Sequence, residues 1–287
     1  MAVAESSAQV ESGLDELDLP VVGSTPWSRR LARVVLPKVV AVAVLLGAWQ
    51  LVTAAGLWRY SLPAPADVWG AFTDQLHRGT VTQAIRTTLL HAAEGYAIAV
   101  AIGTPLGLLI ARFRVVRYAI GSMVASLQSL PSVCWAPIGI VWFGLRPVTL
   151  LFVVVMGAFP SIAMGTIAAV DTIPPLLLRV GSAMGARGLS MYRHIVLPAS
   201  LPGYVAGLKQ AWSFAWRSLM AAELIAYSPG LLGFGLGQML DSGREFSDFS
   251  LMVMTIVLIL VVGVLVDALI FAPLDRSVRR RRGLNAA

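Results

Sequence analysis

Residues 185–203 read GARGLSMYRHIVLPASLPG, a stretch with two arginines and a histidine in a chain that is otherwise strongly apolar. It stands between two long hydrophobic runs and is itself too polar to cross a bilayer. Its apolar residues recur mostly three and four positions apart, which predicts a short amphipathic helix lying flat. We expect Pro198 and Pro202 to break this helix before the next hydrophobic run begins.

The composition is that of a polytopic membrane protein. Hydrophobic residues make up 57% of the chain and charged residues 13%, whereas soluble domains carry about a quarter charged residues. The net charge of +7 comes from basic residues scattered between hydrophobic runs, which form no continuous face for nucleic acid. The single cysteine, Cys134, has no partner for a disulfide or a zinc site. We therefore expect a lipid bilayer as surroundings, no nucleic-acid partner and no bound metal.

Six hydrophobic runs reach the roughly 20 residues that a helix needs to span the hydrocarbon core. Lysine and arginine are more numerous in the flanks on one side, and such a bias marks the cytoplasmic side. Both termini and residues 185–203 are therefore expected in the cytoplasm, in a multi-pass protein of the cytoplasmic membrane with an all-α fold. The predicted spans are residues 34–55, 85–111, 118–143, 147–170, 201–225 and 250–272.

The same pattern divides the chain into four parts. Residues 1–28 are expected to form a disordered acidic cytoplasmic tail, because the first 26 residues hold acidic but no basic side chains and few large apolar ones. This tail lacks the features of a secretory signal, so residues 29–60 are predicted to be an uncleaved first span with its flank. The membrane core occupies residues 61–275, including a cytoplasmic loop at 171–200, and residues 276–287 form a basic cytoplasmic tail.

Motifs for catalysis and nucleotide binding are missing from the sequence. It contains no HExxH, no GxSxG and no GxxxxGK[ST]. Gly233, Gly235 and Gly237 do not form GxGxxG and follow no predicted strand, so we interpret them as a turn. The chain is therefore expected not to be an enzyme and to bind no cofactor or ATP itself.

Several polar side chains fall inside predicted spans, where a charge costs about 2.5–3.5 kcal/mol on insertion scales. We expect Arg217 and Glu94 to face the protein interior, lining a route or neutralising each other, and His91 to be structural. Glu223 is either a pathway residue or a structural carboxylate near the outer surface. The pairs Gly103/Gly107 and Gly203/Gly207 predict close helix packing within the chain. The predicted pathway residues are Glu94, Gln128, Ser129, Ser213, Trp216, Arg217, Met220 and Glu223.

Residues 179–198 resemble a cytoplasmic loop of the permease subunits of binding-protein-dependent ATP-binding-cassette (ABC) importers. In that family the loop carries Glu-Ala-Ala, three residues, Gly, nine residues and then Ile-x-Leu-Pro. Arg179, Val180 and Gly181 stand where the family has its leading triplet. The rest of the motif is matched by Gly185, Ile195, Leu197 and Pro198.

Three further stretches resemble the branch of this family that imports nitrate, sulfonates and taurine. LQSLPSVCWAPIGIVWFG at 127–144 is similar to its third-span signature, and GTPLGLLIARF at 103–113 to its second-span exit. AWRSLMAAELI at 215–225, followed by YSPGLLGFG at 227–235, is similar to its fifth-span exit. The resemblance covers about residues 61–282.

The resemblance implies a type I importer permease with six transmembrane helices. It also implies a homodimer, two cassette ATPases that hold ATP and Mg²⁺, and an extracytoplasmic solute-binding protein. An aliphatic sulfonate or taurine is the favoured substrate, since Arg217 could meet an anion, ahead of nitrate, bicarbonate or a thiamine precursor. The ATPase-coupling residues would be Gly185, Ala186, Arg187, Gly188, Leu189, Tyr192, Arg193, Ile195, Leu197 and Pro198.

Two other functions remain open at this point. An ion- or proton-coupled secondary transporter would use Glu94, Arg217 and Glu223 as a relay at membrane depth. It would leave the loop motif unexplained, and the sequence shows no inverted repeat. A membrane scaffold without transport would leave the polar side of the fifth span without a role.

Overall fold

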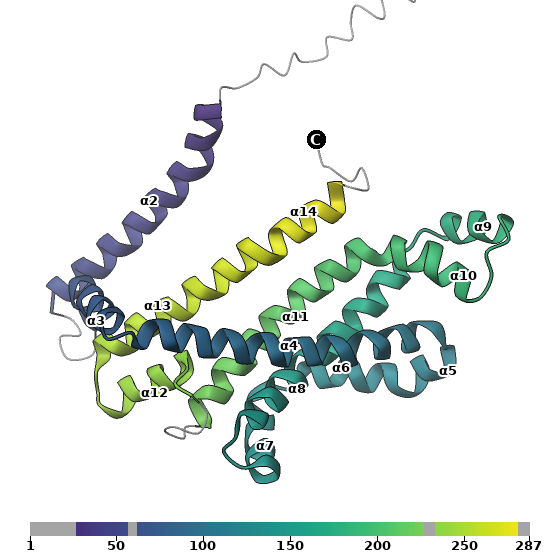
Figure 1. Cartoon of the computed structure of the whole chain (residues 1–287). Coiled ribbons are helices and arrows are strands. Elements are labelled where there is room, and N and C mark those ends of the chain that lie inside the picture. Colours follow the sequence, from purple (N-terminus) through teal and green to yellow (C-terminus); the bar gives the residue numbers. More distant parts are fainter. Residues whose placement is uncertain (1–26, 57–61, 227–232, 281–287) are drawn as a thin grey trace, which may run out of the picture. The chain divides into compact units, whose positions relative to one another are not determined.

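The computed structural model describes residues 27–56, 62–226 and 233–280, and these form helices with no strand among them (Figure 1). The all-α prediction is therefore confirmed. By its contacts the chain divides into two compact units, residues 1–59 and 60–287, which are described separately. Most of the predicted acidic tail and the last seven residues lie outside the described residues.

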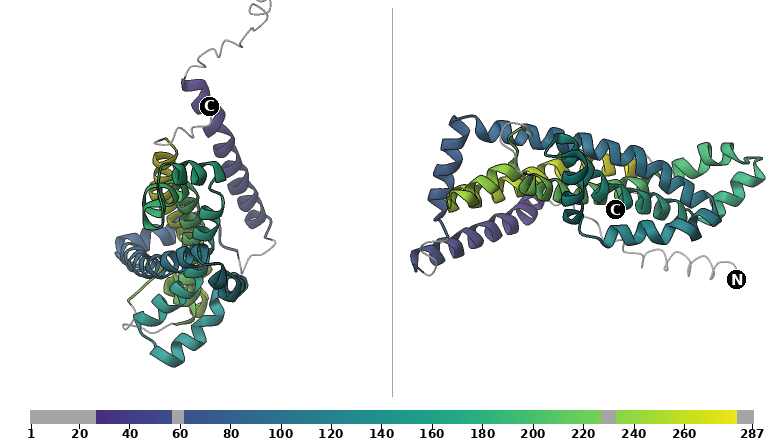
Figure 2. Two further views of the ribbon diagram at one scale, coloured as in Figure 1. Left: turned by 90° about the vertical axis from the view of Figure 1, so that its right-hand side faces the viewer. Right: turned by 90° about the horizontal axis from the view of Figure 1, so that it is seen from below.

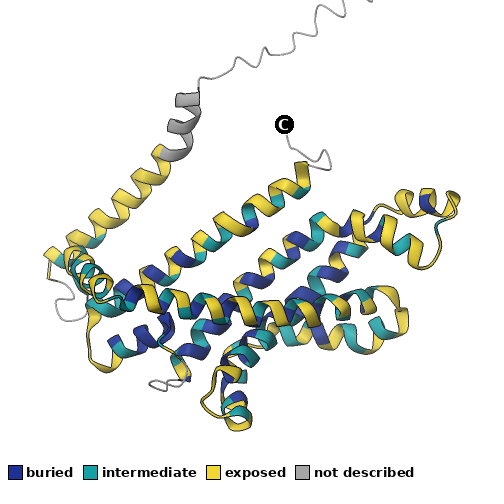
Figure 3. Cartoon of the chain, in the orientation of Figure 1, coloured by how far each residue is buried: buried dark blue, intermediate teal, exposed yellow. Residues whose placement is uncertain are grey.

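The described part of the first unit is a single helix, α2 (Trp27–Ala54). Its segment Leu36–Ala54 is apolar enough to span a membrane and falls within the predicted first span. Nearly all side chains of this segment are exposed (Figure 3). A helix that is apolar all round and has no core of its own needs lipid or other helices to cover it.

The second unit is built on three long helices, α4 (Thr80–Arg112), α8 (Pro147–Asp171) and α11 (Leu197–Ile225). Helix α8 packs along both α4 and α11 and is the most buried candidate span (Figures 2 and 3). The contacts are close because glycines remove the side chain at the crossing points. A Cβ added at Gly107 would lie 2.7 Å from the Ala163 carbonyl oxygen, and one at Gly207 would lie 2.9 Å from the Gly165 Cα. The predicted glycine packing within the chain is confirmed.

Shorter helices surround these three. Helix α3 precedes α4, and α5 to α7 connect α4 to α8. Helices α9 and α10 form the loop between α8 and α11, and α12 to α14 complete the chain. Their bounds are α3 Pro65–His77, α5 Arg114–Val116, η1 Arg117–Gly121, α6 Ser122–Ser129, η2 Ser132–Cys134, α7 Trp135–Phe143, α9 Pro175–Ala183, α10 Leu189–Met191, η3 Tyr192–Val196, α12 Leu236–Glu245, α13 Phe249–Val266, η4 Asp267–Phe271 and α14 Ala272–Arg280.

The predicted third span is bent rather than straight. The helical segments Arg114–Ser129 and Ser132–Phe143 meet at an angle of 96°. Leu130, between them, has extended backbone with ψ of 126°, because a residue that precedes a proline is pushed out of the helical region. Pro131 therefore ends α6 and turns the chain.

All six predicted runs coincide with helical segments, but their number as spans is not confirmed. By length and composition, four described helices qualify, or five if the bent pair counts as one span. Helix α11 is 29 residues long, which is enough to span, yet it is not among them. It carries Lys209, Arg217 and Glu223 along its length. A count of six stays a prediction.

The expectation that Pro198 and Pro202 break the helix before the fifth span is wrong. Helices α10, η3 and α11 follow one another without interruption from Leu189 to Ile225. The turn η3 is a π-helix, in which the Leu197 N–H bonds to the Tyr192 carbonyl, so the backbone is locally widened just ahead of Pro198. The same arrangement recurs where η4, also a π-helix, precedes Pro273.

A buried carboxylate on α11 fixes the start of α12. Glu223 is 1% exposed and accepts hydrogen bonds from the Thr88 hydroxyl at 3.0 Å and the Gly237 N–H at 2.8 Å. The Thr88 hydroxyl oxygen in turn accepts from the Leu236 N–H at 2.8 Å. A carboxylate near a helix N-terminus is favoured by the unpaired N–H groups there. Helices α4, α11 and α12 are thus joined by one cluster, which we call the Glu223 clamp.

The glycines at the start of α12 are explained by this clamp. A Cβ at Gly235 would lie 2.6 Å from the carboxylate carbon of Glu223, and one at Gly237 would lie 2.5 Å from the Glu223 Cβ. The backbone can approach the carboxylate only where both side chains are absent. His91 Nδ1 lies 3.8 Å from the same carboxylate and has no hydrogen-bond partner among the described residues.

We predict that Gly237→Ala lowers the stability of the folded chain, because the added methyl group displaces the Glu223 carboxylate from its buried partners. A loss of roughly 1–3 kcal/mol is expected for such overpacking. Gly70→Ala is the matched control, since Gly70 also lies in a helix but a Cβ there meets nothing within 4 Å. Thermal unfolding of the purified variants measures both effects. Equal melting temperatures for the two variants would contradict the clamp.

Candidate functional site

One side of α11 carries an exposed polar stripe. Lys209, Ser213 and Arg217 are spaced four residues apart and are all exposed. The Lys209 ammonium lies 3.0 Å from a carboxylate oxygen of Asp267, and both side chains are nearly half exposed. The Arg217 Nε–H donates to the Ser213 carbonyl at 2.9 Å, and its guanidinium lies 4.8 Å from the centre of the Phe214 ring. Arg217 has no carboxylate partner among the described residues.

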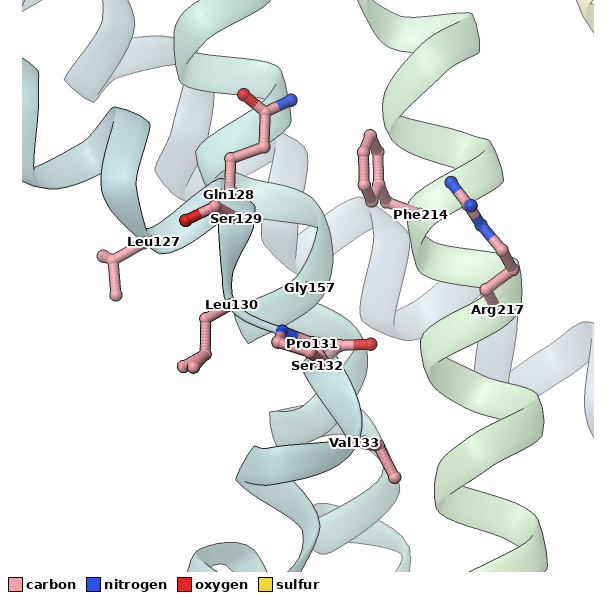
Figure 4. Close-up of a pocket in the computed structure, with 10 residues that line it drawn as sticks. All are labelled: Leu127, Gln128, Ser129, Leu130, Pro131, Ser132, Val133, Gly157, Phe214 and Arg217. Atoms are coloured by element: carbon pink, nitrogen blue, oxygen red, sulfur yellow. The ribbon is translucent and has the colours of Figure 1, made fainter.

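Arg217 borders a pocket of about 300 Å³ between the bend in the third predicted span and α11 (Figure 4). The bend at Pro131 provides one wall, because the chain leaves the helical path at Leu130 and Pro131, between α6 and η2. Gly157 on α8 forms the back of the pocket, and a Cβ at this position would meet Ser218 and Ser132. The Gln128 amide nitrogen lies 3.4 Å from the Ser161 hydroxyl. Leu127, Gln128, Ser129, Leu130, Pro131, Ser132, Val133, Gly157, Phe214 and Arg217 line the pocket.

A second hollow, of about 460 Å³, lies between α11 and α13 and shares Arg217 with the first. Its aromatic wall consists of Trp212 and Trp216, whose rings stack at a centroid distance of 6.1 Å. The Trp212 Nε1 is buried without a hydrogen-bond partner. Asp267 lies at this hollow as well, although no sequence motif identified it. Its partner Lys209 is 58 positions away in the chain, which leaves no local pattern to detect.

The structure brings some of the predicted pathway residues together and separates others. Gln128, Ser129 and Arg217 line the first pocket, and Ser213, Trp216 and Arg217 line the second. Met220 is half-buried and borders neither, and Glu223 is held in its clamp. The contacts of Glu223 are those of a structural carboxylate. Whether these residues form a pathway stays a prediction.

The orientation expected for two charged residues is wrong for the single chain. Glu94 on α4 and Arg217 on α11 are both exposed rather than turned toward the interior. They do not neutralise each other, because neither forms an ion pair in the described part of the chain. Helical periodicity shows which residues share a face, but it could not show whether that face is covered by the same chain.

The loop between α8 and α11 ends α9 with a glycine turn. The Ala186 N–H bonds to the Gly181 carbonyl at 2.9 Å, and the Gly185 N–H bonds to the Ser182 carbonyl at 3.1 Å. This pair of bonds is a Schellman motif, in which the left-handed position after the helix favours glycine. Gly185 occupies that position with φ of +85°, and a Cβ on it would meet nothing within 4 Å. Within this chain it is therefore the positive backbone angle at Gly185, and not a lack of space for a side chain, that requires glycine.

On either side of this turn the loop exposes an apolar side chain, Met184 before Gly185 and Leu189 after it. Met184 is 83% exposed and Leu189 is 84% exposed. Gly181 lies against Ile195 and Met191, so α9 packs closely on the turn η3. The residues 185–188 form the connection, Leu189 lies in α10, residues 192–195 lie in η3, and Leu197 and Pro198 begin α11. The described residues contain no group of His, Cys, Asp and Glu that could hold a metal ion.

The chain is similar in sequence to several curated permeases. It is 26% identical over 247 residues to the taurine transport system permease protein of Escherichia coli (strain K12), covering 84% of this chain and 88% of that protein. It is 27% identical over 241 residues to the nitrate import permease protein of Leptolyngbya laminosa, with coverage of 82% and 85%. It is 29% identical over 234 residues to the riboflavin transport system permease protein of Chloroflexus aurantiacus, with coverage of 80% and 85%.

The fold is similar to that of a solved ABC transporter. The structure matches a chain of the MetNI methionine ABC transporter in an inward-facing conformation with a TM-score of 0.58. The match covers 69% of this chain and 96% of that chain, at 21% sequence identity. The resemblance of the sequence to a type I importer permease is thereby confirmed at the level of the fold.

Residues 103–280, more than half of the chain, match the family model of the binding-protein-dependent transport system inner membrane component. The stretches at 127–144 and 185–198, which carried the resemblance, fall within these residues. The chain therefore belongs to the family of binding-protein-dependent inner membrane components, the multi-pass permease subunits of ABC importers.

Proposed function

We propose that the chain forms, as a homodimer, the membrane pathway for a small organic or inorganic anion. The observation that carries this proposal is the exposed stripe of Lys209, Ser213 and Arg217 on α11. Charged groups at membrane depth are costly when they face lipid. A second copy of the chain packed around this stripe would enclose it together with water, and the two pockets that share Arg217 would open into the enclosed space.

An aliphatic sulfonate or taurine is the substrate that we favour. Arg217 is the one charged residue lining the first pocket, with the amide of Gln128 and the hydroxyls of Ser129 and Ser132 nearby. A guanidinium with unpaired N–H groups binds oxyanions in a planar, two-point arrangement. The taurine and nitrate permeases are named for substrates that contain an anionic group, a sulfonate in taurine and the nitrate ion itself. Nitrate, bicarbonate and a thiamine precursor are the next candidates, and the riboflavin permease shows that relatives differ in substrate.

The loop between α8 and α11 is proposed to contact the ATPase subunits and to transmit the effect of ATP binding to the membrane helices. Two ATPase subunits with ATP and Mg²⁺ would bind the exposed apolar residues around Leu189, and a solute-binding protein would deliver substrate at the opposite end. The two termini and the loop would then lie in the cytoplasm, as the distribution of basic residues predicts. The proposal is supported by the absence from the sequence of any motif with which the chain could bind ATP itself.

A proton-coupled transporter is less consistent with the geometry. Such a mechanism needs Glu94, Arg217 and Glu223 within reach of one another, directly or through water. Glu94 is exposed on α4, Arg217 is exposed on α11, and Glu223 is enclosed by Thr88 and the start of α12. No contact among the three was found in the described residues.

We predict that Arg217→Leu lowers substrate uptake by roughly tenfold or more, because the pocket loses its one cationic group. The amount of assembled complex in the membrane should fall much less than uptake. Arg86→Leu is the control, since Arg86 is an exposed arginine on α4 that lines neither pocket. Uptake into proteoliposomes and the yield of purified complex are measured together. Parallel losses of uptake and assembly would make Arg217 structural.

We also predict that Gly185→Val weakens ATPase attachment or uncouples ATP hydrolysis from uptake, while Gly185→Asn is tolerated. Both side chains have room, but a β-branched residue is strained at a positive φ, and asparagine adopts this region readily. Pull-down of the ATPase, ATP turnover and uptake would be compared for the two variants. Identical behaviour of Val and Asn would show that the turn conformation at Gly185 has no part in coupling.

A further inference from the structure

An apolar groove lies where the end of α4 meets the loop before α11. It has a volume of about 420 Å³ and is open to the surroundings along one side. Its walls come from the last two turns of α4, from α10 and η3, and from the first residue of α11. The lining residues are Pro105, Leu108, Leu109, Arg112, Phe113, Gly188, Leu189, Tyr192 and Leu197.

Arg112 is the one charged residue in the lining. Its guanidinium lies 5.3 Å from the ring centre of Tyr192 and 5.7 Å from that of Phe113. Two aromatic rings hold the cation by cation–π contacts and leave its N–H groups without a carboxylate. Arg112 forms no ion pair in the described part of the chain. The groove therefore ends at a fixed positive charge with free hydrogen-bond donors.

The groove also continues along α4 toward Thr104. A smaller apolar pocket of about 150 Å³ shares Leu108 and Leu197 with it and reaches Thr104 and Tyr204. The hydroxyls of Thr104 and Tyr204 are hydrogen-bonded to each other at 2.7 Å, so they do not require a polar ligand. Arg112 is the last residue of the candidate span Thr80–Arg112, so the charge lies at one end of that span and the apolar pocket lies about two helical turns further into it.

We propose that this groove binds one anionic phospholipid, with its phosphate at Arg112 and an acyl chain against Leu108 and Leu197. The order of groups along the groove is that of a lipid, with a charge at the boundary and apolar surface further in. Basic pockets between helices at a membrane face bind anionic headgroups. Because Arg112 lies over Tyr192, the bound lipid would hold η3, and with it the loop, against the end of α4. This site does not depend on which solute is transported.

The test compares lipid retention by the purified full-length permease and its variants. Detergent-purified protein is incubated with equimolar phosphatidylglycerol and phosphatidylcholine, and the retained lipid is counted by native mass spectrometry. We expect at least threefold preference for phosphatidylglycerol in the wild type and its loss in Arg112→Gln. Arg114→Gln is the matched control, because Arg114 is exposed two residues away but does not line the groove, and it should keep the preference.

A second variant tests the apolar part. Leu108→Trp would fill the groove while leaving Arg112 in place, and it should also lose phosphatidylglycerol. Melting temperatures show whether each variant is folded, and Arg112→Lys, which keeps the charge, should restore most of the preference. Equal effects of Arg112→Gln and Arg114→Gln would indicate only diffuse surface charge and overturn the proposal. Unchanged lipid retention in Arg112→Gln with loss of ATPase pull-down would assign the groove to the ATPase instead.

Discussion

Charged side chains at membrane depth must be paired, buried with partners or kept in contact with water, and the organisation of α11 follows from this constraint. Each of its three charges satisfies it differently. Glu223 is buried and accepts hydrogen bonds from Thr88 and Gly237, Lys209 pairs with Asp267, and Arg217 is left exposed beside two hollows. The first two arrangements hold helices together, whereas the third is available for a ligand. This difference separates the structural charges from the candidate functional one.

The architecture was predictable to the extent that it depends on local pattern. Hydrophobic runs located every long helix, and glycine pairs anticipated the close packing of α8 against α4 and α11. Proline positions were less informative. Pro131 turns the chain by 96°, whereas Pro198 is accommodated in a continuous helix by a π-turn. Whether a proline ends a helix depends on whether the backbone before it can form a π-helical turn, and the presence of a proline in the sequence does not show that.

The candidate site was predictable only in part, because its decisive contacts join distant residues. Thr88 and Glu223 are separated by 135 positions, and the other donor to Glu223 is the backbone N–H of Gly237, which leaves no side-chain signature in the sequence. Gly235 and Gly237, which permit this contact, were interpreted as part of a turn, because the sequence does not show that Glu223 packs against them. Asp267 was missed because its partner lies on another helix. Periodicity identifies the polar face of a helix, but which groups on that face are already satisfied is a property of the fold.

The uninterrupted helical segments from Leu189 to Ile225 run from the loop to the pocket that Arg217 lines. Leu189 and Arg217 are 28 residues apart along them, which corresponds to about 42 Å of helix at 1.5 Å per residue. The π-turn η3 is the place where this helical run can bend, since such turns have weaker and less regular hydrogen bonding. Gly181 and Ile195 pack α9 directly on this turn, and Arg112 lies over Tyr192 within it. If the loop transmits movement as proposed above, contacts that stiffen or loosen η3 would determine how much of it reaches Arg217.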